Sequence, residues 1–116
     1  MFVEKNEILL VDKGNGVMQK MLGHCERMMM VELEFKKGSG FPPHKHDDFA
    51  QAMYVLKGSF ELSCGDVKRT CVAGDACYAM PGEWHGSRSL EDGSVLLDVH
   101  NPMRRDILQE GLDAAK

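Results

Sequence analysis

Apolar and polar residues alternate over several short stretches of this chain, with turn-forming residues between the stretches. From Met29 to Phe35 every second residue is apolar, and Glu32 and Glu34 stand between them. Residues 60–64 repeat the pattern, with Phe60, Leu62 and Cys64 against Glu61 and Ser63. Because successive side chains of a strand point to opposite faces, each stretch predicts a strand with one buried and one wet face. Several short strands separated by turns are typical of an all-β sandwich or barrel.

Three further strands and one short helix follow from the same patterns. Gly65-Asp66 is a turn signal that predicts an antiparallel hairpin between residues 60–64 and Val67–Val72. Gln51–Leu56 and Ser94–Val99 also have the composition of strands, and Pro102 ends the second of them. The tail from Arg104 predicts a short helix with an interruption at Gly111; its apolar residues are Ile107, Leu108 and Leu112.

Length and charge restrict the class of protein. With 116 residues and 13.0 kDa, residues 1–116 are expected to form a single domain. The net charge of -4 leaves no basic stripe, so neither nucleic acid nor an anionic membrane surface is an expected partner. The N-terminus contains Glu4, and its longest apolar run is Ile8–Val11, which suits neither a signal peptide nor a membrane span. These features predict a cytoplasmic protein.

The sulfur-containing residues have a structural interpretation. The four cysteines form no CxxC pair and lie in strand-like segments, so we expect reduced thiols that pack as small apolar groups: Cys25, Cys64, Cys71 and Cys77. Met28, Met29 and Met30 are consecutive in one predicted strand and cannot share a face. We therefore expect the nine methionines to fill the core rather than to form a binding groove.

Residues with metal-binding chemistry gather in two segments. In an extended chain His44 and His46 point to the same side, and Gln51 could return to the same point after a short turn over residues 47–50. His85 follows a Pro81-Gly82 turn in the second segment. Three imidazoles and one amide oxygen would form a facial site for a divalent metal ion, with room for a substrate. Such ligands do not distinguish nickel, zinc, iron and manganese.

Both segments resemble the two signature motifs of the cupin family. The first runs from Gly38 through His44-x-His46 and Gln51 to Gly58, and the second from Gly74 through Met80-Pro81-Gly82 and His85 to Ser89. Together with the intervening hairpin they cover roughly half of the chain. The resemblance implies a small double-stranded β-helix, or jelly-roll, with little helix and a metal inside the barrel. The alternative is a cupin that has lost its metal, or histidines that cap loops.

Two positions depart from the usual cupin motifs. Gln51 stands where a glutamate is usual, and Ser89 where an asparagine is often found. Three neutral imidazoles and an amide would leave the charge of a dication uncompensated, which favours a substrate that carries a carboxylate.

The segment 95–104 supplies candidate acid–base and anion-binding groups. Alternation puts Asp98 and His100 on one face, and if Val95, Leu97 and Val99 pack between the sheets these two face the cavity. Arg104 follows just after Pro102 and could bind a carboxylate, while Asp98 could move a proton. Arg105 is a rival for the carboxylate, and a structural ion pair between Asp98 and Arg104 is the alternative to a catalytic role. His24 is expected in a loop at the surface.

The chain resembles in particular the pectin degradation cupins of the KdgF type, which open the ring of 4,5-unsaturated uronates. That resemblance rests on the His-x-His, Gln and His set and on a stretch Asp-Val-x-x-Pro-x-Arg, here residues 98–104. It implies that Asp98 is the acid–base catalyst and that Arg104 binds the substrate carboxylate. His100 replaces the apolar aromatic residue usual in that group, and it could stack on the sugar or titrate near neutral pH. The metal ligands implied are His44, His46, Gln51 and His85.

Three functions are compatible with these residues. The first is a metal-dependent enzyme that converts 4,5-unsaturated uronates to linear keto-uronates. The second is a non-haem metal dioxygenase acting on a small molecule, because similar facial ligands serve oxygen chemistry. The third is a non-catalytic module that binds sugar acids. A homodimer is expected, because a predicted strand at Glu7–Val11 could pair with a second copy and cover a sheet edge.

Overall fold

The computed structural model describes residues 1–116, and strands are its main secondary structure. A 3-10 turn and one α-helix lie near the two ends of the chain. In chain order the elements are η1 (Lys5–Glu7), β1 (Leu9–Asp12), β2 (Val17–Cys25), β3 (Met28–Phe35), β4 (Gly40–His44), β5 (Ala50–Lys57), β6 (Ser59–Cys64), β7 (Val67–Val72), β8 (Ala76–Ala79), β9 (His85–Ser89), β10 (Ser94–Asn101) and α1 (Arg105–Ala114).

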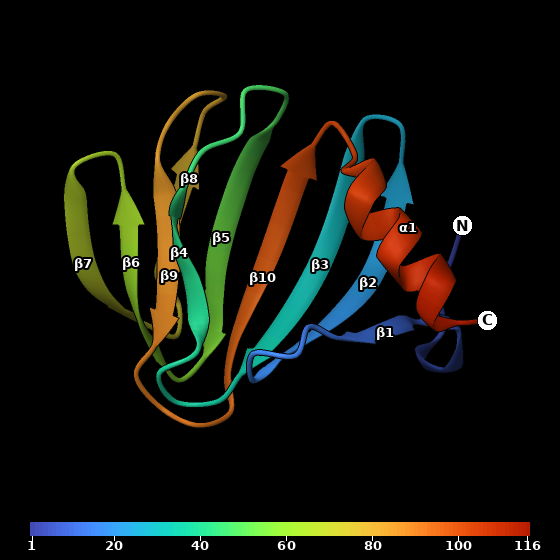
Figure 1. Cartoon of the computed structure of the whole chain (residues 1–116), viewed down its shortest axis with the longest axis horizontal. Coiled ribbons are helices and arrows are strands. Elements are labelled where there is room, and N and C mark those ends of the chain that lie inside the picture. Colours follow the sequence, from blue (N-terminus) through green and yellow to red (C-terminus); the bar gives the residue numbers. More distant parts are fainter.

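The strands form two antiparallel sheets that face each other across a common interior (Figure 1). The six-stranded sheet has the order β1-β2-β3-β10-β5-β8, and the four-stranded sheet has the order β4-β9-β6-β7. Helix α1 packs against β1 and β2, at one side of the six-stranded sheet. This arrangement confirms the predicted jelly-roll class.

The core lies between the sheets, and the alternation in the sequence predicts its faces. In β3 the inward residues Met29 to Phe35 are buried at every second position, while Met28 and Met30 are exposed. Phe35 contacts the rings of Phe41 and Phe60 edge to face, with centroids 6.0 and 5.0 Å apart. Such aromatic pairs add about 0.5 to 1.5 kcal/mol each beyond the burial of their area. The predicted hairpin is also confirmed, since β6 pairs with β7 across the turn at Gly65-Asp66.

Strand β10 was predicted in the right place, but one statement about its faces was wrong. Leu96, Asp98 and His100 point into the barrel and are buried, whereas Val99 is exposed on the outer face and Leu97 is only partly covered there. The register explains this, because β10 lies between β3 and β5 and Asp98 is opposite the buried Val31 and Met53. Asp98 and His100 face the interior as expected, on the same face as Leu96, but the opposite face with Leu97 and Val99 lies outside the barrel and not between the sheets.

Three other local predictions need correction. Helix α1 continues through Gly111 without interruption, because Gly111 packs directly on Leu9 and a Cβ there would lie 3.1 Å from that side chain. His24 is exposed as expected, but it belongs to β2 and not to a loop. The N-terminal strand begins at Leu9, after η1, and pairs with β2 of its own chain.

The sulfur-containing residues follow the predictions in part. All four cysteines are free; Cys71 is buried, but Cys25 is exposed and does not pack as an apolar group. Burial raises the pKa of Cys71. Met21, Met29 and Met53 fill the core, whereas Met28, Met30 and Met80 are exposed. No helix of the protein has both the length and the apolar character needed to cross a membrane.

Candidate metal centre and substrate cavity

His44 and His85 are direct cross-strand neighbours because β4 contains a bulge. Phe41 pairs with Ser87 and His44 pairs with His85, so three residues of β4 span the register of two residues of β9. The extra residue reverses the alternation of side chains, and His44 therefore points into the barrel on the same side as Phe41. Gly86 allows this close approach, since a Cβ there would lie 2.9 Å from the backbone nitrogen of Pro43.

His46 is held by the second motif through the backbone. The Gly82 N–H donates a hydrogen bond of 2.7 Å to the His46 carbonyl. Gly82 has a φ of +84°, and Glu83 N–H donates to the Met80 carbonyl, so Met80–Glu83 is a turn with proline second and glycine third. That sequence suits a type II turn, where glycine tolerates the positive φ. The Pro81-Gly82 turn thereby fixes the loop that carries His46.

The three histidines meet with their donor nitrogens turned towards one point. One nitrogen from each of His44, His46 and His85 lies within 4.8 Å of the others. The Nδ1 atoms of His44 and His85 are 2.7 and 3.2 Å from the carbonyl oxygens of Pro42 and Glu83, which leaves their Nε2 atoms for another partner. The Nε2 atoms of His46 and His85 are buried without any hydrogen bond. Such a carbonyl contact at the second nitrogen is usual for imidazoles that bind metals.

Gln51 lines the same cavity as the three histidines and is hydrogen-bonded to Asp98. The Gln51 Nε2 donates a hydrogen bond of 3.0 Å to Asp98 Oδ2. This bond orients the amide so that Gln51 Oε1 is left buried and without a partner, as is Asp98 Oδ1. Buried polar atoms normally have partners, so unpartnered atoms on several residues that line one cavity indicate a ligand site. Three imidazole nitrogens and one amide oxygen fit a divalent transition metal ion.

Burial sets the protonation states of the site. Burial, with the positive charge of Arg104 and the neighbouring histidines, lowers the pKa of His46 to about 4. Burial also lowers the pKa of His85, and burial together with Arg104 lowers the pKa of His100 to about 3. These imidazoles are neutral near pH 7, the form that binds metal. Burial raises the pKa of Asp98 to about 7, against the opposing effects of Arg104 and the Gln51 hydrogen bond.

Arg104 lies at the edge of the same site, but its ion pair is with Asp106 and not with Asp98. The Nε and Nη2 atoms of Arg104 donate bonds of 3.2 and 2.6 Å to the two oxygens of Asp106. Although burial acts in the opposite direction, this hydrogen bond and charge lower the pKa of Asp106. The side of the guanidinium is thus occupied, and its Nη1–Nη2 end stays free for a second anion. Arg105, the rival candidate, is exposed and does not line the cavity.

Phe49 organises the aromatic side of the site. Its ring stacks on His46 with centroids 4.3 Å apart, contacts His100 edge to face at 5.5 Å, and lies 4.9 Å from the guanidinium of Arg104. The sequence reasoning missed this residue. Its position between the His-x-His pair and Gln51 was the available signal, because an aromatic side chain there must lie close to both.

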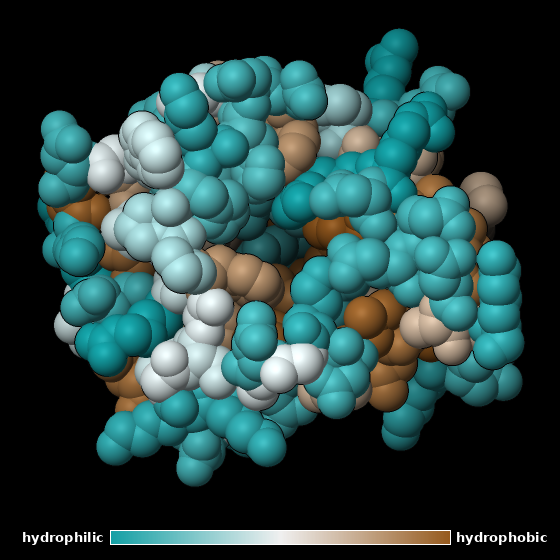
Figure 2. Space-filling view, in the orientation of Figure 1, coloured by the Kyte–Doolittle hydropathy of each residue, from teal (hydrophilic) through white to brown (hydrophobic).

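The polar groups open into one cavity of about 420 Å³ between the sheets. Ligand pockets have volumes of about 300 to 1,000 Å³. The space-filling view shows a hollow near the middle of the face that is bordered by β4 and α1 in Figure 1 (Figure 2). Besides the histidines, Gln51, Asp98, His100 and Arg104, the lining includes three polar residues that the sequence did not indicate: Lys13, Gln19 and Ser87.

A family model described as a cupin domain (Cupin_2) matches residues 31–100. The chain is a cupin. Over 95 residues it is 44% identical to the pectin degradation protein KdgF of Dickeya dadantii (strain 3937). The aligned region covers 82% of this chain and 86% of that protein.

Solved structures agree with this assignment over nearly the whole chain. The structure of KdgF from Halomonas sp. superposes on this cupin with a TM-score of 0.87 and 32% identity, and covers 92% of this chain and 97% of that one. An RmlC-like cupin from Shewanella frigidimarina NCIMB 400 gives a TM-score of 0.85 and 30% identity, covering 91% and 94% of the two chains.

The fold of this cupin brings together every residue that was predicted for the site. His44, His46 and His85 form one cluster, Gln51 and Asp98 are hydrogen-bonded, and His100 and Arg104 line the same cavity. These residues come from β4, β5, β9, β10 and the two loops beside them. Only pairing between strands distant in the sequence could assemble them.

Proposed function

We propose that this cupin is a metal-dependent enzyme that opens the ring of 4,5-unsaturated uronates and yields linear keto-uronates. The observation that carries the proposal is the group of buried donor atoms without partners on His46, Gln51 and His85, directly beside a buried carboxyl group. The relationship to KdgF proteins supports the same chemistry, because the relative from Dickeya dadantii is described as a pectin degradation protein.

In this proposal His44, His46, Gln51 and His85 hold a divalent metal ion. When bound, the ion would act as a Lewis acid on an oxygen of the substrate without changing its oxidation state. All four ligands are neutral, so the charge of the ion is not cancelled within its own ligand set. The resulting positive potential, with Arg104 at the edge, favours an anionic substrate.

Asp98 moves the proton. Burial raises its pKa to about 7 in the metal-free protein, and a raised pKa favours the protonated form that an acid catalyst requires. One oxygen accepts the Gln51 hydrogen bond, and Oδ1 is free to face the substrate. The hydrogen bond from Gln51 therefore fixes which carboxyl oxygen carries the reaction.

Arg104 and His100 orient the sugar acid. The free Nη1–Nη2 end of Arg104 can bind the substrate carboxylate in a bidentate manner, while Asp106 fixes the other side of the guanidinium. The buried ring of His100, packed edge to face on Phe49, presents a flat surface against which a sugar ring can lie. His100 thus keeps the shape of the aromatic residue that it replaces.

The reaction is an isomerisation whose atoms balance. Asp98 delivers a proton to C4 of the enol ether, and C5 becomes electron-deficient. The hydroxyl group at C1 loses its proton, the bond between C1 and the ring oxygen breaks, and that oxygen becomes the C5 ketone. C1 becomes an aldehyde, and the proton released from its hydroxyl group restores the acid.

The test is the ultraviolet absorption of the conjugated double bond of a 4,5-unsaturated galacturonate. Metal-loaded protein should bleach it at a rate proportional to enzyme concentration, with a linear keto aldehyde identified by NMR and no oxygen consumed. Bleaching that requires oxygen would identify a dioxygenase instead. Tight binding of the substrate without any bleaching would identify a non-catalytic sugar-acid module.

We also propose a homodimer in which a second copy covers the outer face of the six-stranded sheet. Apolar side chains line up across neighbouring strands there, with Met30, Val99 and Tyr78 in one row and Leu97 and Tyr54 in the next. Exposed apolar patches of this kind mark interaction sites. Sedimentation should give twice the monomer mass, and the variant Tyr78→Arg should sediment with the mass of a monomer.

We also propose a cytoplasmic location, which agrees with the four free cysteines.

A further inference from the structure

The cavity has a second polar end, away from the histidine cluster, which the proposed reaction does not use. Gln19 of β2 is only 3% exposed and lines the cavity, between the buried apolar residues Val17 and Met21 of the same face. None of the side-chain hydrogen bonds involves Gln19, whereas the amide of Gln51 donates to Asp98. The Gln19 amide is not among the fully enclosed atoms without partners, so it borders the open space of the cavity. A buried amide facing a cavity without a partner indicates a polar ligand.

Lys13 reaches the same end of the cavity. Val11 is opposite Gln19 in the pairing of β1 with β2, and Lys13 N–H bonds the carbonyl of Val17 just beyond it. Lys13 and Gln19 therefore point to the same face as diagonal neighbours, a separation that long side chains can bridge. Both residues line the cavity.

Helix α1 positions Lys13 as it positions Arg104. Lys13 Nζ lies 2.6 Å from Glu110 Oε2, and Arg104 Nη2 lies 2.6 Å from Asp106 Oδ2. Each cation is 19% exposed, while Glu110 and Asp106 are 38% and 62% exposed. Asp106 and Glu110 are four residues apart, about 6 Å along the helix axis. The helix thus holds one cation at each end of the cavity mouth.

We propose that Gln19 and Lys13 form a second subsite, which binds hydroxyl groups of the sugar acid at the end remote from its carboxylate. Glu110 neutralises Lys13 and Gln19 is uncharged, so this end has no excess positive charge for another carboxylate. An amide that both donates and accepts, beside an ammonium donor, suits neighbouring hydroxyl groups. The sugar acid itself is taken from the proposed function.

The spacing of the two ends fits one sugar ring. Gln19 pairs with Leu33 of β3, and Leu33 pairs with Leu96 of β10. Asp98 is two residues after Leu96, so Gln19 and Asp98 are two strands and two residues apart on the same face of the sheet. With strands about 4.8 Å apart and a rise of about 3.3 Å per residue, their Cα atoms are roughly 12 Å apart. Two inward side chains with one six-membered ring between them span this distance.

Binding of D-galacturonate to the metal-loaded protein, measured by calorimetry, tests the subsite. This saturated sugar acid has no double bond to react. Gln19→Leu and Lys13→Met should each weaken its binding about tenfold, the loss of one hydrogen bond to substrate. Tetrahydropyran-2-carboxylate keeps the ring and the carboxylate but has no hydroxyl groups. Both variants should therefore bind it with an affinity within about twofold of that of the wild-type protein.

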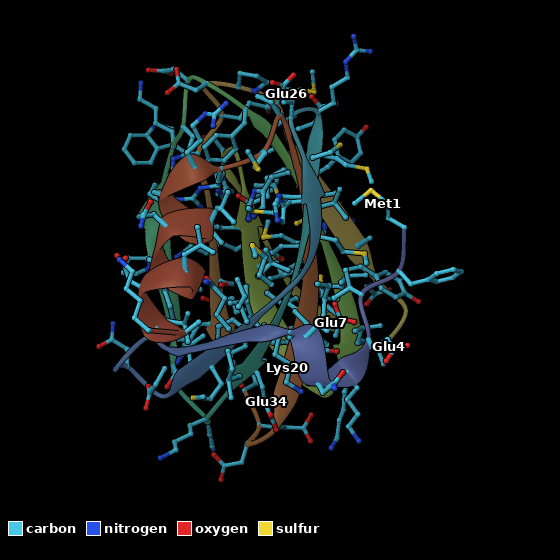
Figure 3. The ribbon with its side chains drawn as sticks, turned by 90° about the vertical axis from the view of Figure 1, so that its right-hand side faces the viewer. Met1, Glu4, Glu7, Lys20, Glu26 and Glu34 are labelled. Atoms are coloured by element: carbon cyan, nitrogen blue, oxygen red, sulfur yellow. The ribbon has the colours of Figure 1, made fainter.

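Matched controls exist on the outer surface. Lys20 is also paired with a glutamate, Glu32 at 3.5 Å, but it lies on the outer face of β2 (Figure 3). Gln109 is exposed on α1 and bonds Asp113. Lys20→Met and Gln109→Leu should leave the binding of both ligands unchanged.

Several results would overturn the subsite: no binding of galacturonate to wild type, wild-type affinity in both cavity variants, or equal weakening of both ligands. The outcome is separate from that of the proposed function. If the protein does not bleach the substrate but galacturonate binding depends on Gln19, the proposed reaction is wrong and the subsite stands. If the protein bleaches the substrate but the Gln19 and Lys13 variants bind galacturonate like wild type, the reaction stands and the subsite is wrong.

Discussion

The two ends of β10 lie in two parts of the barrel interior. Buried polar groups have hydrogen-bond partners in one of these parts and lack them in the other. Where β10 begins, Ser94 is fully buried beside Phe35, and its hydroxyl donates to the Glu91 carbonyl and accepts from Ser59 N–H. Where it ends, Asp98 Oδ1 and His100 Nδ1 are buried without partners. An unpartnered buried group costs about 1 to 3 kcal/mol, so the second end is maintained at the expense of stability. The difference separates the part that holds the fold from the part available for a ligand.

The largest expected effect comes from removing the metal ligands. His85→Ala, or treatment of wild type with a chelator, should lower the rate of bleaching at least about a thousandfold, or about 4 kcal/mol. Metal content by mass spectrometry should fall together with the rate. His24→Ala is the control, because His24 is exposed and does not line the cavity. Full activity of a metal-free protein would contradict the claim that the polar groups at this end bind a metal needed for the reaction.

Asp98→Asn should lower kcat by about 10² to 10⁴-fold, because the amide cannot deliver a proton. Substrate binding, measured by calorimetry, should change little, since the amide can still accept the hydrogen bond from Gln51. Asp66→Asn in the exposed hairpin turn is the control. If kcat stays high in the Asp98 variant, another group moves the proton.

The same variant should be more stable than wild type when both are metal-free, and the gain should depend on pH. The pKa of Asp98 rises from 3.8 to about 7 on folding, so its contribution to stability is present below pH 4 and is lost as the pH rises through 7. The advantage of Asp98→Asn should grow between pH 4 and 7 to a few kcal/mol and then level off. Urea unfolding at several pH values measures it. A gain that does not vary with pH would show that Asp98 is already ionised without cost.

The smallest effect is expected at the other end of the interior. Phe60→Leu should lower the free energy of unfolding by about 2 kcal/mol, through loss of the edge-to-face contact with Phe35 and of buried area. At temperatures where the protein stays folded, kcat should not change. Phe2→Leu, at the exposed N-terminus, is the control. A large loss of kcat would mean that the two ends are coupled.

The sequence predicted the apolar faces well and the site in part. The alternation in β3 and β6 is local, and the burial of Phe35 and Phe60 follows from it. On β10 the same rule misassigned Val99, because a strand that carries Asp98 and His100 inward violates the usual preference for apolar interiors. Motif spacing predicted the histidines, but the β4 bulge that turns His44 inward depends on its pairing with β9.

Residues whose role depends only on tertiary packing could not be predicted. Gln19 is the polar residue between Val17 and Met21 on the inward face of β2, and Lys13 follows the end of β1. Only the pairing of β1 with β2 and the position of α1 bring them to the cavity. The continuation of α1 through Gly111 depends likewise on its contact with Leu9. Local sequence contains no information about either contact.

Diffraction from crystals of metal-loaded Asp98→Asn protein soaked with a 4,5-unsaturated galacturonate would test the account most directly. We expect the metal on His44, His46, Gln51 and His85, the substrate carboxylate on Arg104, and C4 next to the side chain at position 98. A metal bound by other groups, or a sugar acid outside the cavity or with its carboxylate turned away from Arg104, would contradict the account.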